Sequence, residues 1–104
     1  MLLSLITATY NSSATLADTL TSVREQSYPH LEHLIVDGLS SDPTLSILRQ
    51  FPHARLVVSE RDSGIYEAMN KGILAAKGEV IGLLNSDDLY INKEVVQKIG
   101  RAHV

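Results

Sequence analysis

Cysteine and tryptophan are absent from this chain of 104 residues, and proline occurs only three times. The lack of cysteine excludes disulfides, thiol catalysis and thiolate zinc sites. Nine Lys and Arg stand against twelve Asp and Glu, without a basic stripe, which excludes a nucleic-acid surface and an electrostatic membrane anchor. No apolar run approaches the ~20 residues of a membrane-spanning helix. We therefore expect one small cytoplasmic domain with no membrane segment and no nucleic-acid partner.

Four short apolar runs, at residues 2–8, 34–36, 56–58 and 80–84, are each followed by polar residues. A short apolar run bounded by turn residues is typical of a buried strand. Helical patterns separate the runs, so the strands should be parallel with right-handed crossovers. Because the runs do not alternate with polar residues, both faces of each strand should be buried. We predict an α/β fold, a doubly wound and mostly parallel Rossmann-like open sheet.

The apolar spacing also predicts the three helices. The second should begin at Asp42, which is a good N-cap before a proline. In the third, Ile65, Met69 and Ile73 are spaced by four and should form its buried face. Gly78 should follow in the left-handed conformation that commonly ends a helix.

The last seven residues, 98–104, differ from the rest of the chain. They read like one frame of a common short-read sequencing adapter. We therefore expect a domain over residues 1–97 and a non-native tail over residues 98–104, which is left out of the fold prediction. A natural C-terminal helix is the alternative, and the source nucleotide sequence distinguishes the two.

Acidic residues follow three of the predicted strands, at Asp37, Asp62 and the pair Asp87 and Asp88. Parallel strands end along one edge of a sheet, where ligands bind in open α/β folds, so these side chains should converge. Clustered carboxylates repel one another unless a cation compensates. Oxygen ligands without thiolates favour Mg²⁺ or Mn²⁺ over zinc. The alternative is that these residues only cap helices and stay solvated, which is our interpretation of Asp42 because Asp-Pro is typical of a helix start.

Four segments, in this order and spacing, resemble glycosyltransferase family 2. The likeness is to the N-terminal half of its GT-A fold, in members of the bacterial polysaccharide-biosynthesis type. Each segment alone is a weak signal, but together they extend over nearly all of the chain from Leu3 to Tyr90. The segments are Thr7–Asn11, Ile35–Asp42, Glu60–Ile73 and Gly78–Asp88.

The resemblance implies roles for the matching residues. Thr7 and Tyr10 would line a nucleotide pocket, and Asp37 would accept a hydrogen bond from the base, typically uracil. The acidic pair would lie at the ribose and at a Mn²⁺ or Mg²⁺ ion on the diphosphate. The implied nucleotide-sugar-binding residues are Thr7, Tyr10, Asp37, Asp62 and Asp87, and the implied metal ligands are Asp87 and Asp88.

Two positions depart from the family pattern. Asn85 stands where many members have the first acid of an Asp-x-Asp motif, so the charge facing a metal is lower. Leu39 replaces the usual glycine in the second loop, which puts the shape of that turn in doubt.

The implied activity is inverting transfer of a sugar from a nucleotide diphosphate sugar, with UDP as the expected nucleotide, to a glycan or lipid-linked acceptor. In this family the carboxylate that accepts the acceptor proton lies beyond the acidic pair, so we assign no catalytic residue here. The fragment should be inactive alone, and a full-length parent would work in the cytoplasm or at the inner face of the membrane. The alternative is a non-catalytic nucleotide-binding α/β module.

Overall fold

The computed structural model describes residues 2–86, which alternate between strands and helices in the predicted order. Each predicted apolar run lies in a strand or overlaps one. The 98–104 tail and the domain limit at residue 97 lie outside the described residues. The elements are β1 (Leu3–Thr9), α1 (Leu16–Arg24), β2 (Leu31–Asp37), α2 (Thr44–Leu48), β3 (Ala54–Ser59), α3 (Ile65–Ala75) and β4 (Val80–Leu83).

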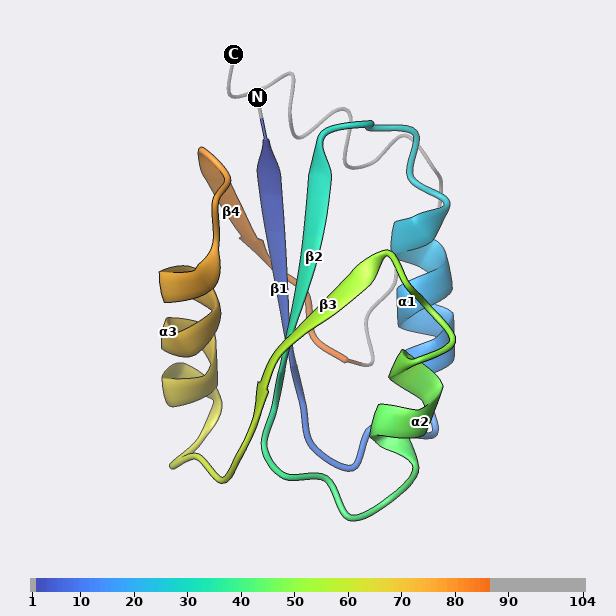
Figure 1. The fold of residues 1–104 in the computed structure, drawn as a ribbon, viewed down its shortest axis with the longest axis vertical. Coiled ribbons are helices and arrows are strands. Elements are labelled where there is room, and N and C mark those ends of the chain that lie inside the picture. The colour runs from blue at the N-terminus through green and yellow to red at the C-terminus, as the bar shows by residue number, and fades with distance from the viewer. Residues whose placement is uncertain (1, 87–104) are drawn as a thin grey trace.

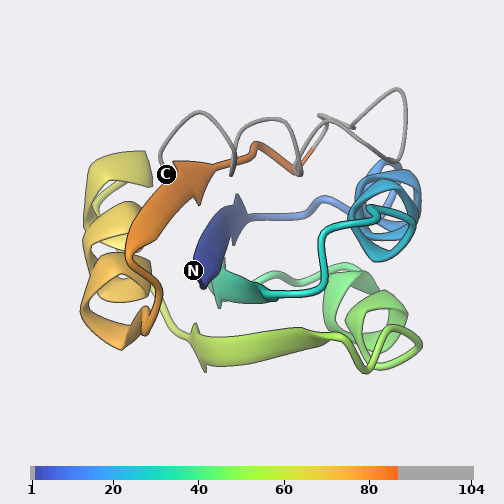
Figure 2. The same ribbon diagram turned by 90° about the horizontal axis from the view of Figure 1, so that it is seen from above.

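The four strands form one parallel sheet in the order β3-β2-β1-β4. The chain moves outward from β1 to β3 and then crosses back to place β4 on the other side of β1. Helices α1 and α2 cover one face of the sheet and α3 covers the other (Figure 2). The prediction of a doubly wound parallel α/β sheet is therefore confirmed.

The two central strands, β1 and β2, contain most of the fully buried side chains. Leu34 and Ile35 are adjacent in β2, so their side chains point to opposite faces of the sheet. Both are fully buried, because helices cover both faces. Ile35 packs with residues of α1 and α2, whereas Leu34 packs with Met69 of α3. Burial on both faces explains why the apolar run in β2 does not alternate with polar residues.

The edge strands differ from the prediction, which expected every strand to be buried on both faces. Leu56 of β3 is 40% exposed and Leu83 of β4 is 58% exposed. Both strands have a hydrogen-bonded neighbour in the sheet on only one side among residues 2–86. An apolar run predicts a strand but does not indicate whether that strand is central or at an edge of the sheet. The prediction of burial on both faces was therefore wrong for β3 and β4.

The face that α3 presents to the sheet also differs from the prediction. Met69 and Gly72 are buried, but Ile65 is 52% exposed and Ile73 is 42% exposed. A Cβ atom at Gly72 would lie only 2.4 Å from Cγ2 of Ile6, so the helix approaches β1 closely through a small residue. The face that packs is therefore the one that carries Gly72 together with Met69, and not the Ile65–Ile73 stripe.

Gly78 does not adopt the left-handed conformation predicted for it. A Cβ atom there would lie 2.4 Å from Ser4 Oγ and 2.7 Å from the carbonyl oxygen of Leu2. The Gly78 N–H donates to Ser4 Oγ at 2.8 Å. The glycine is therefore required for close approach to β1 just before β4 begins, and the prediction of a helix-ending turn was wrong.

Across residues 2–86, no helix combines the length and the apolar character needed to cross a membrane. The loops that follow β1, β2 and β3 lie together at one end of the sheet, the lower end in Figure 1. This is the carboxyl edge, where open α/β sheets bind their ligands.

Candidate functional site

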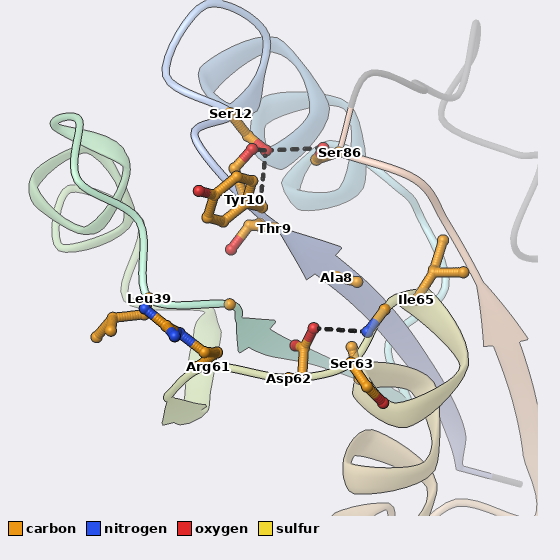
Figure 3. A pocket seen from close by; sticks show the side chains of 13 residues that line it. Ala8, Thr9, Tyr10, Ser12, Leu39, Arg61, Asp62, Ser63, Ile65 and Ser86 are labelled. Atoms are coloured by element: carbon orange, nitrogen blue, oxygen red, sulfur yellow. Dashed lines mark hydrogen bonds between the residues drawn. The ribbon is translucent and has the colours of Figure 1, made fainter.

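A cavity of about 600 Å³ opens at the carboxyl edge of the sheet. Its wall comes from the end of β1 with the loop after it, the loop after β2, the β3–α3 loop, the start of α3 and Ser86 (Figure 3). The lining residues are Ala8, Thr9, Tyr10, Ser12, Gly38, Leu39, Arg61, Asp62, Ser63, Gly64, Ile65, Ala68 and Ser86.

Asn11 joins the loop after β1 to the loop after β2. Its backbone has a φ of 47°, in the left-handed region that asparagine tolerates better than most residues. Its side-chain oxygen accepts the N–H groups of Ser41 at 2.8 Å and Asp42 at 3.3 Å, and its own N–H donates to Ser40 Oγ at 2.9 Å. The two loops therefore form one connected rim.

Asp42 has the capping role predicted for it, although the N-cap position itself is occupied by Pro43. Its carboxylate accepts the Thr44 N–H at 3.0 Å, the Thr44 hydroxyl, and the Ser13 N–H at 3.1 Å. These hydrogen bonds, led by that from the Thr44 hydroxyl, lower the pKa of Asp42 to about 2. Asp42 therefore holds α2 to the loop after β1 and does not line the cavity.

Asp37, the last residue of β2, is fully buried and does not line the cavity. Its Oδ1 accepts the hydroxyls of Thr9 and Ser40, each at 2.6 Å. Its Oδ2 accepts the Ser40 N–H at 2.9 Å and the Ser59 hydroxyl at 2.8 Å. Burial alone would raise the pKa of Asp37, but these hydrogen bonds outweigh it and hold the pKa below its usual value. The buried carboxylate connects the ends of β1, β2 and β3.

Asp62 and Tyr10 do line the cavity, with Gly38 between them. A Cβ atom at Gly38 would lie 3.4 Å from Asp62 Oδ2 and 3.5 Å from Tyr10 Cδ1. Asp62 Oδ1 accepts the Gly64 N–H at 3.2 Å, and the Tyr10 side chain is 66% exposed. The structure thus brings together an aromatic ring and a carboxylate from loops far apart in the sequence, both next to Gly38.

Thr7 lies deeper in β1, is fully buried and does not line the cavity. Its hydroxyl lies 2.7 Å from Nε2 of His33. Burial, and then the neighbouring His53, lower the pKa of His33 to about 3, so its imidazole is neutral at pH 7. Asp87 and Asp88 lie outside the described residues, and their roles stay predictions.

Leu39 resolves the doubt about the second loop. It has a φ of 66°, the left-handed conformation that glycine adopts most readily, and its side chain is 54% exposed at the rim of the cavity. The turn therefore keeps a glycine-like shape despite the leucine, with some strain in the backbone.

Most residues that line the cavity were not predicted from the sequence, and Arg61 and Ser86 are two polar examples. Arg61 brings a guanidinium group to the cavity wall, and its place directly before Asp62 is the one hint that the sequence offers for it. Ser86 is fixed at the rim, since its hydroxyl accepts from Ser12 Oγ at 2.9 Å and its carbonyl accepts the hydroxyls of Thr15 and Thr19, each at 2.9 Å. No sequence pattern indicated those contacts with α1.

The arrangement is suited to a ligand with a flat group and a polar or anionic part. Tyr10 offers a ring for stacking, Asp62 accepts hydrogen bonds, and Arg61 can pair with an anion. Within residues 2–86 there is no group of three His, Asp or Glu side chains that could hold a metal ion.

Residues 4–102 match the sequence profile of Glycosyl transferase family 2. TuaG of Bacillus subtilis (strain 168), which carries the name of a teichuronic acid biosynthesis glycosyltransferase, is 39% identical over 101 residues. WfaP of Escherichia coli, named as a UDP-Glc:alpha-D-GlcNAc-diphosphoundecaprenol beta-1,3-glucosyltransferase, is 31% identical over 100 residues. The matches cover 93% and 94% of this chain, which spans only 40% of the length of each relative.

Two solved structures share the fold. The structure of S. aureus TarS 1-349 in complex with UDP-GlcNAc has a TM-score of 0.89 and 30% identity, over 97% of this chain and 30% of that one. The mannosyltransferase PcManGT from Pyrobaculum calidifontis, in complex with GDP-Man and Mn²⁺, has a TM-score of 0.84 and 28% identity, over 90% of this chain and 30% of that one.

Proposed function

The chain belongs to glycosyl transferase family 2, and from this membership we propose that it is the donor-binding part of an inverting glycosyltransferase. The donor is a nucleotide diphosphate sugar with UDP as its nucleotide, and the acceptor is a glycan or a lipid-linked glycan. The observation that carries the proposal is the cavity of about 600 Å³ between Tyr10 and Asp62 at the carboxyl edge of the sheet. UDP-GlcNAc and GDP-Man bound to the two structural neighbours support the class of ligand.

In this proposal the nucleoside lies over Gly38, where a side chain is lacking. The Tyr10 ring stacks on the base, and Asp62 accepts a hydrogen bond from the nucleoside. Arg61 faces the same cavity and can pair with a phosphate oxygen. The position of Gly38 supports this placement, because it lines the cavity and both Tyr10 and Asp62 lie next to it.

Asp37 and Thr7 need a different account from the three residues at the cavity wall. The Asp37 carboxylate already accepts four hydrogen bonds, so Ser40 would have to release one oxygen before a base could bind there. We propose that Asp37 acts on the base only through such an exchange, and otherwise holds the loops in place. Thr7 acts through its contact with His33, which supports the end of β1.

Asp87 and Asp88 are the proposed ligands of a Mg²⁺ or Mn²⁺ ion, with Asp87 also near the ribose. The fixed position of Ser86 at the cavity rim supports this, because the acidic pair follows it directly in the chain. A bound divalent cation supplies Lewis-acid stabilisation of the charge that develops on the diphosphate leaving group. The Mn²⁺ ion of the mannosyltransferase structure is consistent with this choice of cofactor.

Sugar transfer also needs a base for the acceptor hydroxyl, and we propose no residue of this chain for that step. The chain spans 40% of the length of its relatives, which leaves room for acceptor-binding residues elsewhere in a longer protein. We therefore propose that this chain binds donor but does not transfer sugar alone. A cytoplasmic site of action, at the inner face of the membrane for a longer parent, is supported by the diphosphoundecaprenol acceptor in the name of WfaP.

Calorimetric titration of UDP into the chain, with and without Mn²⁺, tests the proposed function. We expect binding that depends on the metal and is lost in Asp62→Ala and in Asp88→Ala. Glu79→Ala is the control, because Glu79 is an exposed acidic residue beyond α3, and this variant should bind UDP with unchanged affinity. Metal-independent binding that survives Asp88→Ala would contradict the proposed metal site, and no binding at all would contradict the donor site. A sugar-transfer assay on the longer parent separates an enzyme from a non-catalytic nucleotide-binding module.

A further inference from the structure

The β3–α3 loop carries residues 61–64 of the cavity wall. Glu60, the first residue of this loop, is held to α3 by an ion pair. Lys71 Nζ lies 3.0 Å from Oε1 of Glu60, the residue directly before this part of the wall. The same nitrogen lies 3.5 Å from Oε1 of Glu67, one helical turn earlier in α3. A single ammonium group therefore connects the start of the loop to the body of the helix.

Glu67 extends the connection to the other end of the loop. Its Oε2 accepts the Ser63 N–H at 2.7 Å and also the Ser63 hydroxyl. The residues on both sides of the cavity-lining pair 61–62 are thus held by one network. We call this network the Lys71 clasp, and it consists of Glu60, Ser63, Glu67 and Lys71.

The charges of the clasp explain why a cation is needed at its centre. The carboxylates of Glu60 and Glu67 contact the same nitrogen, so they lie close together and would repel each other without it. The hydrogen bond to Glu60 raises the pKa of Lys71, which keeps the ammonium charged. The Glu60 side chain is 56% exposed, and ion pairs at such a surface contribute little to global stability. The clasp therefore acts mainly on the local order of the loop.

We infer that Lys71 is a positioning residue for the nucleotide, which holds the β3–α3 loop so that Arg61 and Asp62 face the cavity before the ligand binds. The inference rests on the proposed function, since it concerns the same cavity. A loop that is ordered in advance loses less conformational entropy when its ligand binds, so loss of the clasp lowers affinity. Lys71 itself does not line the cavity, and its effect is indirect.

The test titrates UDP with Mn²⁺ into the full chain and into Lys71→Met and Lys71→Arg. We expect the Kd for UDP to rise roughly fivefold in Lys71→Met, with an unchanged melting temperature, and to stay near the original value in Lys71→Arg. Lys77→Met is the matched control, because Lys77 is an exposed lysine just beyond α3 and its loss changes the net charge equally. Amide hydrogen exchange at residues 61–64 should be faster in Lys71→Met than in Lys77→Met.

The outcomes distinguish this inference from the proposed function. If the unchanged chain binds UDP and Lys71→Met binds it equally well, the inference is overturned and the proposed function stands. If the unchanged chain binds no UDP, both are overturned. Equal losses in Lys71→Met and Lys77→Met would indicate a general charge effect and also overturn the inference. If Lys71→Met does not fold, Glu60→Ala removes the exposed half of the clasp, and an unchanged affinity there overturns the inference.

Discussion

Thr9 Oγ1 donates a 2.6 Å hydrogen bond to Oδ1 of Asp37, and this contact joins the ends of the two central strands beneath the cavity. Both residues are buried, and the carboxylate accepts three further hydrogen bonds from Ser40 and Ser59. A buried carboxylate with four donors is stable only while it is ionised, because protonation would leave it one acceptor short. The floor of the site therefore depends on the charge of Asp37.

Asp37→Asn should destabilise the fold by about 3 kcal/mol. The amide NH₂ group of asparagine would face groups of Thr9, Ser40 or Ser59 that now donate hydrogen bonds to the carboxylate. The pKa of Asp37 is lowered in the folded chain, so its contribution is present above pH ~4 and is lost as the pH falls through that lowered pKa. Urea unfolding at pH 7 measures the change, with the exposed Glu79→Gln as control. A loss no larger than that of Glu79→Gln would contradict this account.

His33 should make the stability of the chain fall in mild acid. Its pKa is about 3 in the folded chain, lowered mainly by burial, whereas the unfolded chain takes up a proton near pH 6.5. Between these values only the unfolded state binds the proton, so the free energy of unfolding should drop by about 2 kcal/mol from pH 7 to pH 5 on account of this residue. Urea unfolding at both pH values checks this.

The comparison for His33 is His33→Gln, which cannot titrate in this range. We expect its loss of stability between pH 7 and pH 5 to be smaller than that of the unchanged chain by the His33 contribution. His53, whose pKa is also lowered by burial, remains in both proteins and adds a decline of the same sign. Equal slopes in the two proteins would mean that His33 is not held neutral by the fold.

Leu39→Gly should stabilise the chain relative to Leu39→Ala by about 1 kcal/mol. Both variants lose the leucine side chain, which is 54% exposed, but only alanine keeps a Cβ atom at a φ of 66°. Thermal and urea unfolding of the two variants, side by side, isolate the strain of the left-handed backbone. If Leu39→Ala proved the more stable of the two, the left-handed turn would be wrong.

Gly38→Ala and Gly78→Ala should separate binding from stability. A methyl group at Gly78 would lie 2.7 Å from a backbone carbonyl, so that variant should lose about 2 kcal/mol of stability. A methyl group at Gly38 would meet Asp62 and Tyr10 at ordinary contact distances of 3.4 and 3.5 Å and should leave the fold intact. It would narrow the cavity floor, so UDP affinity should fall while the melting temperature changes little. The opposite pattern would contradict the assignment of the two glycines.

The sequence was sufficient to predict the order of the elements and the parallel sheet, because buried apolar runs and helical spacings are local signals. The capping role of Asp42 was predictable for the same reason. The packing face of α3 was not, since it depends on the close approach of Gly72 to Ile6, a contact between distant parts of the chain. The prediction of a left-handed turn at Gly78 was wrong for the same reason, because the close neighbours of this glycine are Leu2 and Ser4 at the start of the chain.

Within the candidate site, the sequence indicated which edge of the sheet would carry the polar residues, and Tyr10 and Asp62 were both selected as members of the site. It could not indicate that Asp37 would be enclosed by hydroxyl groups, because those of Thr9 and Ser59 come from neighbouring strands. Arg61 was overlooked because its only signal is its place next to Asp62, which does not say where the side chain points. Contacts across the sheet decide which polar residue faces the ligand and which supports the loops.

The central claim is that a nucleotide binds over Gly38, between Tyr10 and Asp62. Chemical-shift mapping of the isotopically labelled chain, titrated with UDP and Mg²⁺, tests it most directly. The account predicts that the largest amide shifts cluster at Tyr10, Gly38 and residues 61–64. It predicts little change at His33 and His53, which line a different cavity toward the amino end of the sheet. Largest shifts around His33 and His53, or no shifts at saturating UDP, would contradict it.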